Sequence, residues 1–294
     1  MKKFKKVVRL LWVNWRTMAE FEILYKLLSL TVFVPVFWGI FHAVMKMTGY
    51  DYLTIENVLS FLTNPLTIAA LSILFVCMAF YSMIDFGAVI FLLDQSYQGN
   101  KADLMQTVRY AVRNAVRVFH RRNILVAFAV LFLIPFLNIG VASSFVSSIA
   151  IPEFILDFIK GNWYLLVLSA CAVAVLGLLM LRWLYAFHYF TLEGCSFKEA
   201  RTKSISLGSK NKTKDLAALL GIQLAVSVLF LVFVIAGVWI AVCLGGLFSK
   251  LKLLGVVSSS VVWVYLAVSL LIVSALGTPI SYACISILYY GHKE

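Results

Sequence analysis

The chain has 294 residues, of which 63% are hydrophobic and 13% charged, and its mean hydropathy is +0.97. Soluble domains are roughly half apolar and about a quarter charged, so this composition excludes an ordinary water-soluble enzyme, a disordered chain and a nucleic-acid-binding domain. The net charge of +12 fits membrane topology and anionic lipid better than nucleic acid. The sequence therefore predicts an integral membrane protein.

A basic amphipathic helix is predicted before the first apolar run and another before the third. In the first, an apolar stripe from Phe4 to Trp15 lies opposite lysines and arginines. In the second, the stripe runs from Leu104 to Phe119, and arginines recur every fourth residue on a neighbouring face. Such helices lie in the headgroup plane, so these arginines are predicted to contact anionic lipid; topology and simple anchoring are the plainer alternative. The arginines are Arg109, Arg113, Arg117 and Arg121.

Six apolar stretches are long enough to cross a bilayer. A helix needs about 20 largely apolar residues to span roughly 30 Å of hydrocarbon. Helices are expected because backbone groups in lipid must pair internally, and no alternating barrel pattern occurs. We therefore predict an all-α integral membrane protein with six transmembrane helices. The stretches are Leu27–Met45, Leu66–Leu93, Ile124–Val141, Trp163–Phe190, Leu216–Phe248 and Val256–Tyr289.

Short helices are predicted in the loops on one side of the membrane. Thr54 is placed to cap a helix from Ile55 to Leu62, and Pro152 with Glu153 is placed to open a second one. The opposite loops carry most of the lysines and arginines, in the N-terminal segment and after the second and fourth spans. By the positive-inside rule both termini are predicted to be cytoplasmic.

Similar residues follow the second, fourth and sixth spans at nearly equal spacing. Gly99, Gly194 and Gly291 each close a short polar or aromatic sequence. We interpret the chain as one domain of three parallel repeats, each a basic helix plus two spans, over about 1–99, 100–194 and 195–291. Chance similarity among apolar hairpins is the alternative.

Two charges fall within the spans, Asp85 in the second and Arg182 in the fourth. Charges in a span are costly and usually face the bundle. The two residues lie at similar depth when counted back from Gly99 and Gly194, at 1.5 Å per helical residue. We predict an ion pair between them that joins two helices. The alternatives are that Arg182 binds a substrate phosphate or carboxylate, or that Asp85 relays protons.

Catalytic and metal-binding motifs are absent from the sequence. There is no Walker A loop, nucleophile elbow or His-Glu-x-x-His helix, and cysteines and histidines are scattered. His188 is better read as a packed or interfacial histidine than as a catalyst. No catalytic residue, metal or cofactor is predicted.

Several polar landmarks spread over nearly the whole chain resemble the bacterial family of glycerophosphoryl diester phosphodiesterase membrane domains. The matching stretches are Tyr25 to Leu30, Tyr52 to Thr54, Asn64 to Ile68, Leu92 to Gly99, Asn123 to Leu125, Ile151 to Asp157, His188 to Gly194 and Ser196 to Ala200. The resemblance implies a membrane region that commonly precedes a metal-dependent TIM-barrel phosphodiesterase. The barrel's His-Arg-Gly element has no counterpart, since Arg122 follows His120-Arg121. No catalytic residue is therefore carried over.

Three functions are compatible with these features. The first is a noncatalytic domain of the bacterial cytoplasmic membrane that anchors, or feeds lipid-derived substrate to, a phosphodiesterase catalytic domain or partner, with anionic lipids as further partners. The second is a small transporter or permease centred on Asp85 and Arg182. The third is an intramembrane enzyme acting on lipid headgroups, for which no second convergent acid or histidine lies at that depth.

Overall fold

The computed structural model describes residues 2–123, 125–130, 160–183, 185–207 and 277–293, with isolated residues between 221 and 239. Every regular element in those residues is helical, which confirms the all-α prediction. The α-helices are α1 (Lys2–Val13), α2 (Trp15–Leu28), α3 (Val34–Met47), α4 (Ile55–Thr63), α5 (Pro65–Tyr97), α6 (Leu104–Val116), α10 (Trp163–Arg182), α11 (Ala186–Leu192), α12 (Phe197–Leu207) and an unlabelled helix over 277–293.

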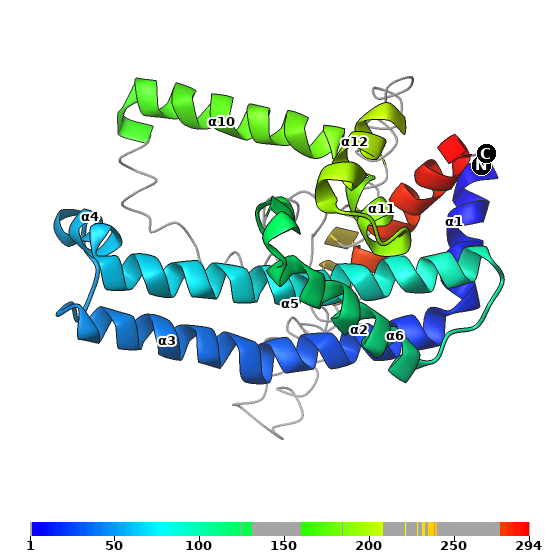
Figure 1. Ribbon diagram of the computed structural model, residues 1–294, viewed down its shortest axis with the longest axis horizontal. Helices are drawn as coiled ribbons and strands as arrows, with labels where there is room; N and C mark the ends of the chain where they lie inside the picture. Colours follow the sequence, from blue (N-terminus) through cyan, green and yellow to red (C-terminus); the bar gives the residue numbers. More distant parts are fainter. Residues whose placement is uncertain are drawn as a thin grey trace.

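Two long apolar helices form an antiparallel hairpin (Figure 1). One runs continuously from Trp15 to Met47 through α2 and α3, and the other is α5; each has 33 residues. Within the described part of the chain, these two are long and apolar enough to cross a membrane. They contain the first two predicted spans, although the first helix begins twelve residues before the predicted Leu27. The predicted third and fifth spans, and the first part of the sixth, lie largely outside the described residues.

The first long helix widens into a π-helical segment at Ser29–Phe33, just before Pro35. Proline has no N–H to donate and its ring crowds the carbonyl four residues earlier. A π-helical turn absorbs that mismatch without breaking the helix. The predicted fourth span, Trp163–Phe190, corresponds to two helices rather than one. In the structure α10 ends at Arg182 and α11 begins at Ala186.

The loop between the two long helices carries α4, as the sequence predicts. The backbone N–H of Thr54 donates to Asn57 Oδ1 at 2.7 Å, which completes a capping box. Phe61 is buried, whereas Leu59 and Leu62 are exposed. The helix predicted to open at Pro152 lies outside the described residues.

The end of the hairpin that holds both chain termini is closely packed, and we call it the terminal end (Figure 1). The buried core of α5 is concentrated between Ala79 and Leu93. There α6 crosses α5 at close range: a Cβ on Gly87 would lie 3.5 Å from the Cα of Ala111. The opposite end, which we call the α4 end, is formed by α3, α4 and the first half of α5.

Two of the three glycine landmarks have the same backbone conformation. Gly99 follows α5 with φ +78° and Gly194 follows α11 with φ +64°, a left-handed conformation that favours glycine. Gly291 instead lies within the helix over 277–293. The third landmark therefore differs from the first two.

An asparagine side chain accepts a hydrogen bond from the loop that follows Gly99 and from the loop that follows Gly194. Asn14 Oδ1 accepts the N–H of Ala102 at 3.0 Å, and Asn123 Oδ1 accepts the N–H of Phe197 at 3.1 Å. Ala102 and Phe197 each lie three residues after their glycine. The loop after each left-handed glycine is thus bound by an asparagine from the segment between a basic helix and the apolar run that follows it.

The helix over 277–293 packs against the ends of α5 and α11. The Tyr290 ring stacks on Tyr97 with centroids 3.9 Å apart, and the Tyr290 hydroxyl donates to the Asp94 carboxylate. His188 and Ser286 are joined by a 2.8 Å hydrogen bond. Segments far apart in the sequence thus meet at the terminal end.

Candidate functional site

The terminal end holds three buried charges, Glu22, Lys26 and Asp85, which we call the charge cluster. Lys26 Nζ lies 2.7 Å from Glu22 Oε2, and these side chains are 4% and 0% exposed. The charge of Asp85 interacts with both of them across the interface of α2 and α5. The spacing of Glu22 and Lys26 places them one helical turn apart on one face of α2.

Two tyrosines fix α2 against α5 beside the charge cluster. The hydroxyl of Tyr25 donates to the carbonyl of Tyr81 at 3.2 Å, and the hydroxyl of Tyr81 donates to the carbonyl of Tyr25 at 2.7 Å. Their rings stack with centroids 4.4 Å apart. This reciprocal pair fixes the register of the two helices, and with it the separation of the charges.

The structure does not bring Asp85 and Arg182 together. Asp85 is buried in α5, whereas Arg182 is exposed at the end of α10. Among the residues that the structure describes, no ion pair joins them. Equal depth in a bundle does not place two residues on facing sides of their helices. The cation whose charge acts on Asp85 is instead Lys26.

The sequence pattern does not by itself indicate that Glu22 and Lys26 form a buried pair. Lys26 contributed to the basic N-terminal segment, yet it is only 3% exposed and lies within the long helix from Trp15 to Met47. The available signal was an acid and a base four residues apart at the start of an apolar run. In an apolar setting that spacing indicates a buried pair as readily as a loop charge.

A second polar feature of the terminal end is a cavity of about 370 Å³ between α1, the end of α5 and the helix over 277–293. Lys6 and Arg9 line it from α1, Gln98 from the end of α5, and the stacked Tyr97 and Tyr290 form a further wall. Within the described chain, neither Lys6 nor Arg9 forms an ion pair. The cavity therefore combines two exposed basic side chains with aromatic and amide groups, and the Asp94 carboxylate accepts hydrogen bonds from the lining Gln98 and Tyr290.

The four arginines predicted to contact lipid have different surroundings. Arg117 donates to the carbonyls of Phe190 and Cys195 at 2.7 and 2.6 Å, and its guanidinium lies 4.2 Å from the centroid of the Phe190 ring. Burial lowers the pKa of the Arg117 guanidinium. The cation thus binds one carbonyl at the C-terminal end of α11 and one in the loop that follows it.

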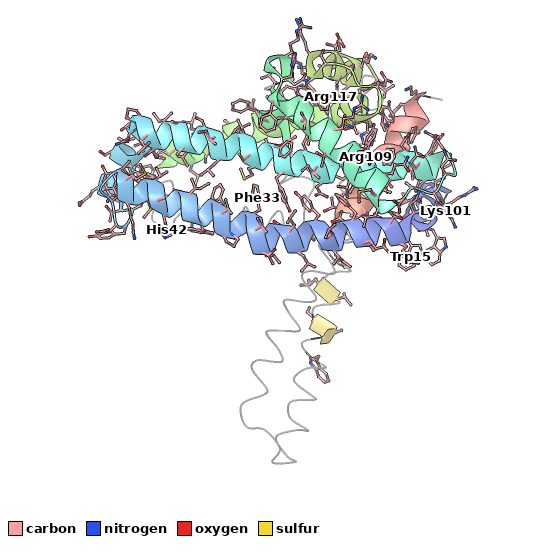
Figure 2. All side chains as sticks on the ribbon, turned by 60° about the horizontal axis from the view of Figure 1, so that its bottom comes forward. Trp15, Phe33, His42, Lys101, Arg109 and Arg117 are labelled. Carbon is pink, nitrogen blue, oxygen red and sulfur yellow. The ribbon has the colours of Figure 1, made fainter. Side chains whose placement is uncertain are left out.

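Arg109 and Arg113 are exposed on α6, and Figure 2 shows Arg109 farther along this helix toward Lys101 than Arg117. The side chain of Arg121 lies outside the described set. The face of α6 beside Arg109 is also apolar and exposed, which is typical of an interfacial helix. Its exposed apolar residues are Met105, Val112 and Val116, and Phe119 just beyond α6 is exposed as well.

Glu193 connects α11 to α12 and to the C-terminal helix. Its carboxylate oxygens lie 2.6 Å from Lys203 Nζ and 2.8 Å from Lys293 Nζ. Partial burial alone would raise the pKa of Glu193, but the hydrogen bonds from the two lysines outweigh it and lower the pKa below its ordinary value. This bridge joins the end of the second predicted repeat to α12 and to the helix over 277–293.

His188 is packed rather than exposed to a cavity. It is 1% exposed, bonded to Ser286 and stacked 5.1 Å from Tyr289. In the described residues, no three His, Cys, Asp or Glu side chains gather closely enough to hold a metal ion. In this described part of the chain, the candidate binding features are therefore the charge cluster and the basic cavity.

Apolar helices of this length, together with the family comparison, define the class: this is a helical membrane domain. The chain belongs to the family described as the membrane domain of glycerophosphoryl diester phosphodiesterase, whose model matches residues 4–294. This confirms the resemblance inferred from the sequence. Searches of curated proteins and of solved structures returned no match. The family is a membrane domain rather than the catalytic domain, which is compatible with a protein that is not an enzyme.

Proposed function

We propose that this protein is a noncatalytic domain of the bacterial cytoplasmic membrane that binds the phosphate-bearing headgroup of lipid-derived glycerophosphodiesters and presents it to a phosphodiesterase catalytic domain or partner. The observation that carries the proposal is the basic cavity at the terminal end. Its volume of about 370 Å³ is within the range of small-molecule sites. Lys6 and Arg9 supply charge for a phosphate, and Tyr97 with Gln98 supplies apolar and hydrogen-bonding walls for the alcohol groups.

The position of the cavity supports this role. Each long helix of 33 residues is about 50 Å long at 1.5 Å per residue, which exceeds the roughly 30 Å of hydrocarbon. If the α4 end lies at one boundary of the hydrocarbon, the terminal end projects beyond the other. We propose that the terminal end is cytoplasmic, since it carries the basic segments, and that α1 and α6 lie against the headgroups there.

We propose further that the chain is a single domain of six spans in three repeats. The matching hydrogen bonds of Asn14 and Asn123, and the matching conformations of Gly99 and Gly194, support the first two repeats. The landmark at Gly291 supports the third by sequence alone.

Binding measurements on the full chain in nanodiscs of zwitterionic lipid test the cavity. Glycerophosphoglycerol, glycerophosphoethanolamine and inorganic phosphate serve as separate probes. We expect both diesters to bind, and the variant Lys6→Gln/Arg9→Gln to bind them at least tenfold more weakly. The matched control is Arg109→Gln/Arg113→Gln, which removes two exposed charges outside the cavity and should leave diester affinity unchanged.

The arms of this experiment distinguish the possible sources of the anion. Equal loss in both double variants would show diffuse attraction and would overturn the cavity as a site. Binding of inorganic phosphate alone would exclude presentation of a diester. Pelleting with vesicles that contain anionic lipid should weaken in the Arg109→Gln/Arg113→Gln variant. Hydrolysis of either diester by the purified chain would contradict the noncatalytic role.

The alternative of a small transporter is favoured by one specific observation, the buried charge cluster of Glu22, Lys26 and Asp85. The cluster lies on the two long helices toward the end that we place at the cytoplasmic boundary, and ionisable side chains on membrane helices often mark ion or proton pathways. Proton-coupled flux in liposomes that is lost in Asp85→Asn would favour this alternative over presentation of headgroups.

A further inference from the structure

The charge cluster has a feature that the headgroup cavity does not explain: it is deeply buried and its formal charges do not cancel. Glu22 is 0% exposed, Lys26 3% and Asp85 4%. One ammonium group therefore serves two carboxyl groups: Lys26 contacts Glu22 directly and acts on Asp85 through its charge alone. A net charge removed from water is strongly unfavourable unless it is neutralised.

The groups that face the cluster come from three packed elements. Tyr25 lies on α2 with Glu22 and Lys26, Tyr81 lies on α5 with Asp85, and Tyr282 lies on the helix over 277–293. The charge of Asp85 interacts with all three tyrosines. Lys26 is the cation whose charge acts on both carboxylates. The surroundings therefore supply no second positive charge within the described residues.

Polar atoms of the cluster also lack hydrogen-bond partners. Glu22 Oε1, Asp85 Oδ1 and the Tyr282 hydroxyl are each buried without a partner in the described structure. A carboxylate oxygen only accepts hydrogen bonds, whereas a protonated carboxyl group also donates one. One added proton would therefore neutralise the cluster and supply a missing donor.

We propose that Glu22, Lys26 and Asp85 form a proton-binding site in which the two carboxyl groups hold one exchangeable proton at neutral pH. The proton forms an O–H bond with one carboxylate, and the other stays ionised beside Lys26. The site is neutral when the proton is bound and carries one negative charge when it is released. Release and rebinding thus change the charge between α2, α5 and the C-terminal helix, which is the event that a proton-coupled membrane protein requires.

A proton fits this site better than a larger cation does. The Lys26 ammonium already contacts Glu22 at 2.7 Å and repels another cation. Among the described residues, no group of three metal-ligating side chains gathers here or elsewhere. The Tyr25–Tyr81 pair joins α2 and α5 with two hydrogen bonds. These bonds oppose the separation of the two helices that a larger ion would require.

Infrared spectroscopy of the full chain in nanodiscs tests the proposal directly. At neutral pH the wild type should show the carbonyl band of a buried, protonated carboxylic acid, with a small shift in heavy water. The variants Asp85→Asn and Glu22→Gln should each lose or displace this band. Asp51→Asn, which alters an exposed carboxylate in the loop before α4, is the matched control and should retain it.

Labelling wild-type aspartate with ¹³C keeps the test valid if a variant does not fold, since a band that involves Asp85 shifts with the label. The proposal is overturned if the wild type has no such band at neutral pH. It is also overturned if the band persists in both Asp85→Asn and Glu22→Gln. Loss of the band on adding sodium or potassium would replace the proton site with a metal-cation site. None of these results depends on diester binding, so this proposal and the headgroup cavity fail separately.

Discussion

The α4 end and the terminal end use the same two long helices in opposite ways. In α3 only Val44 and Met45 are buried, whereas α5 is almost continuously buried from Ser82 to Leu93. Exposed large apolar residues such as Val36, Trp38 and Ile73 mark the α4 end, and Glu22, Lys26 and Asp85 are buried at the terminal end. Figure 2 shows His42 and Trp15 at these opposite ends. An apolar surface facing lipid needs no covering protein, whereas buried charges need packed neighbours and a fixed geometry.

Replacing one lysine at each end of the first long helix gives the largest expected difference. Lys26→Met removes the cation of the charge cluster and leaves two buried carboxyl groups without it. Breaking a buried pair in this way typically costs about 3–5 kcal/mol. We expect a corresponding loss of stability to detergent-induced unfolding, monitored by circular dichroism.

Lys46→Met is the matched control, because Lys46 is exposed near the α4 end of the same helix. Its effect should stay within about 0.5 kcal/mol, as for most surface substitutions. Equal effects of Lys26→Met and Lys46→Met would remove the energetic distinction between the two ends.

Hydropathy predicted the elements at the α4 end well. The two long helices contain the first two predicted spans, and the Thr54 cap of α4 was identified from its sequence. These features depend on local composition and on hydrogen bonds within a few residues. A helix in lipid satisfies its own backbone, so its existence does not depend on distant partners.

The arrangement of the terminal end was harder to predict because it depends on the direction that each side chain takes around its helix. Counting residues gave Asp85 and Arg182 a similar depth, but Asp85 interacts electrostatically with Lys26 instead. Likewise, a four-residue period grouped Arg117 with Arg109 and Arg113, yet Arg117 binds carbonyls near the end of α11. A single sequence indicates which face of a helix is apolar or charged, but not which other segment packs against that face.

Arg113 in α6 and Arg117, the residue that follows α6, provide a smaller contrast within the terminal end itself. Arg117→Met removes donors to the carbonyls of Phe190 and Cys195 and the cation over the Phe190 ring. Leaving such acceptors unpaired should cost about 2 kcal/mol. Arg113→Met changes an exposed side chain one turn earlier and should have little effect on stability. Thermal unfolding of both variants in one detergent measures the difference, and a larger loss for Arg113→Met would reverse the assignment.

The smallest effect is expected at Glu193, whose bridge to Lys203 and Lys293 is partly exposed. Because the two lysines hold the folded pKa of Glu193 below its ordinary value of 4.5, the bridge stabilises the protein above that pH and loses its contribution as the pH falls through the folded value. Solvent screening keeps the contribution below about 1 kcal/mol. Wild type should therefore unfold at a slightly higher temperature than Glu193→Gln at neutral pH, and this gap should close in acid. The control Glu20→Gln affects only the exposed pair with Arg16 and should show a smaller gap. A wild-type advantage that persists in strong acid would show that Glu193 acts through packing rather than through its charge.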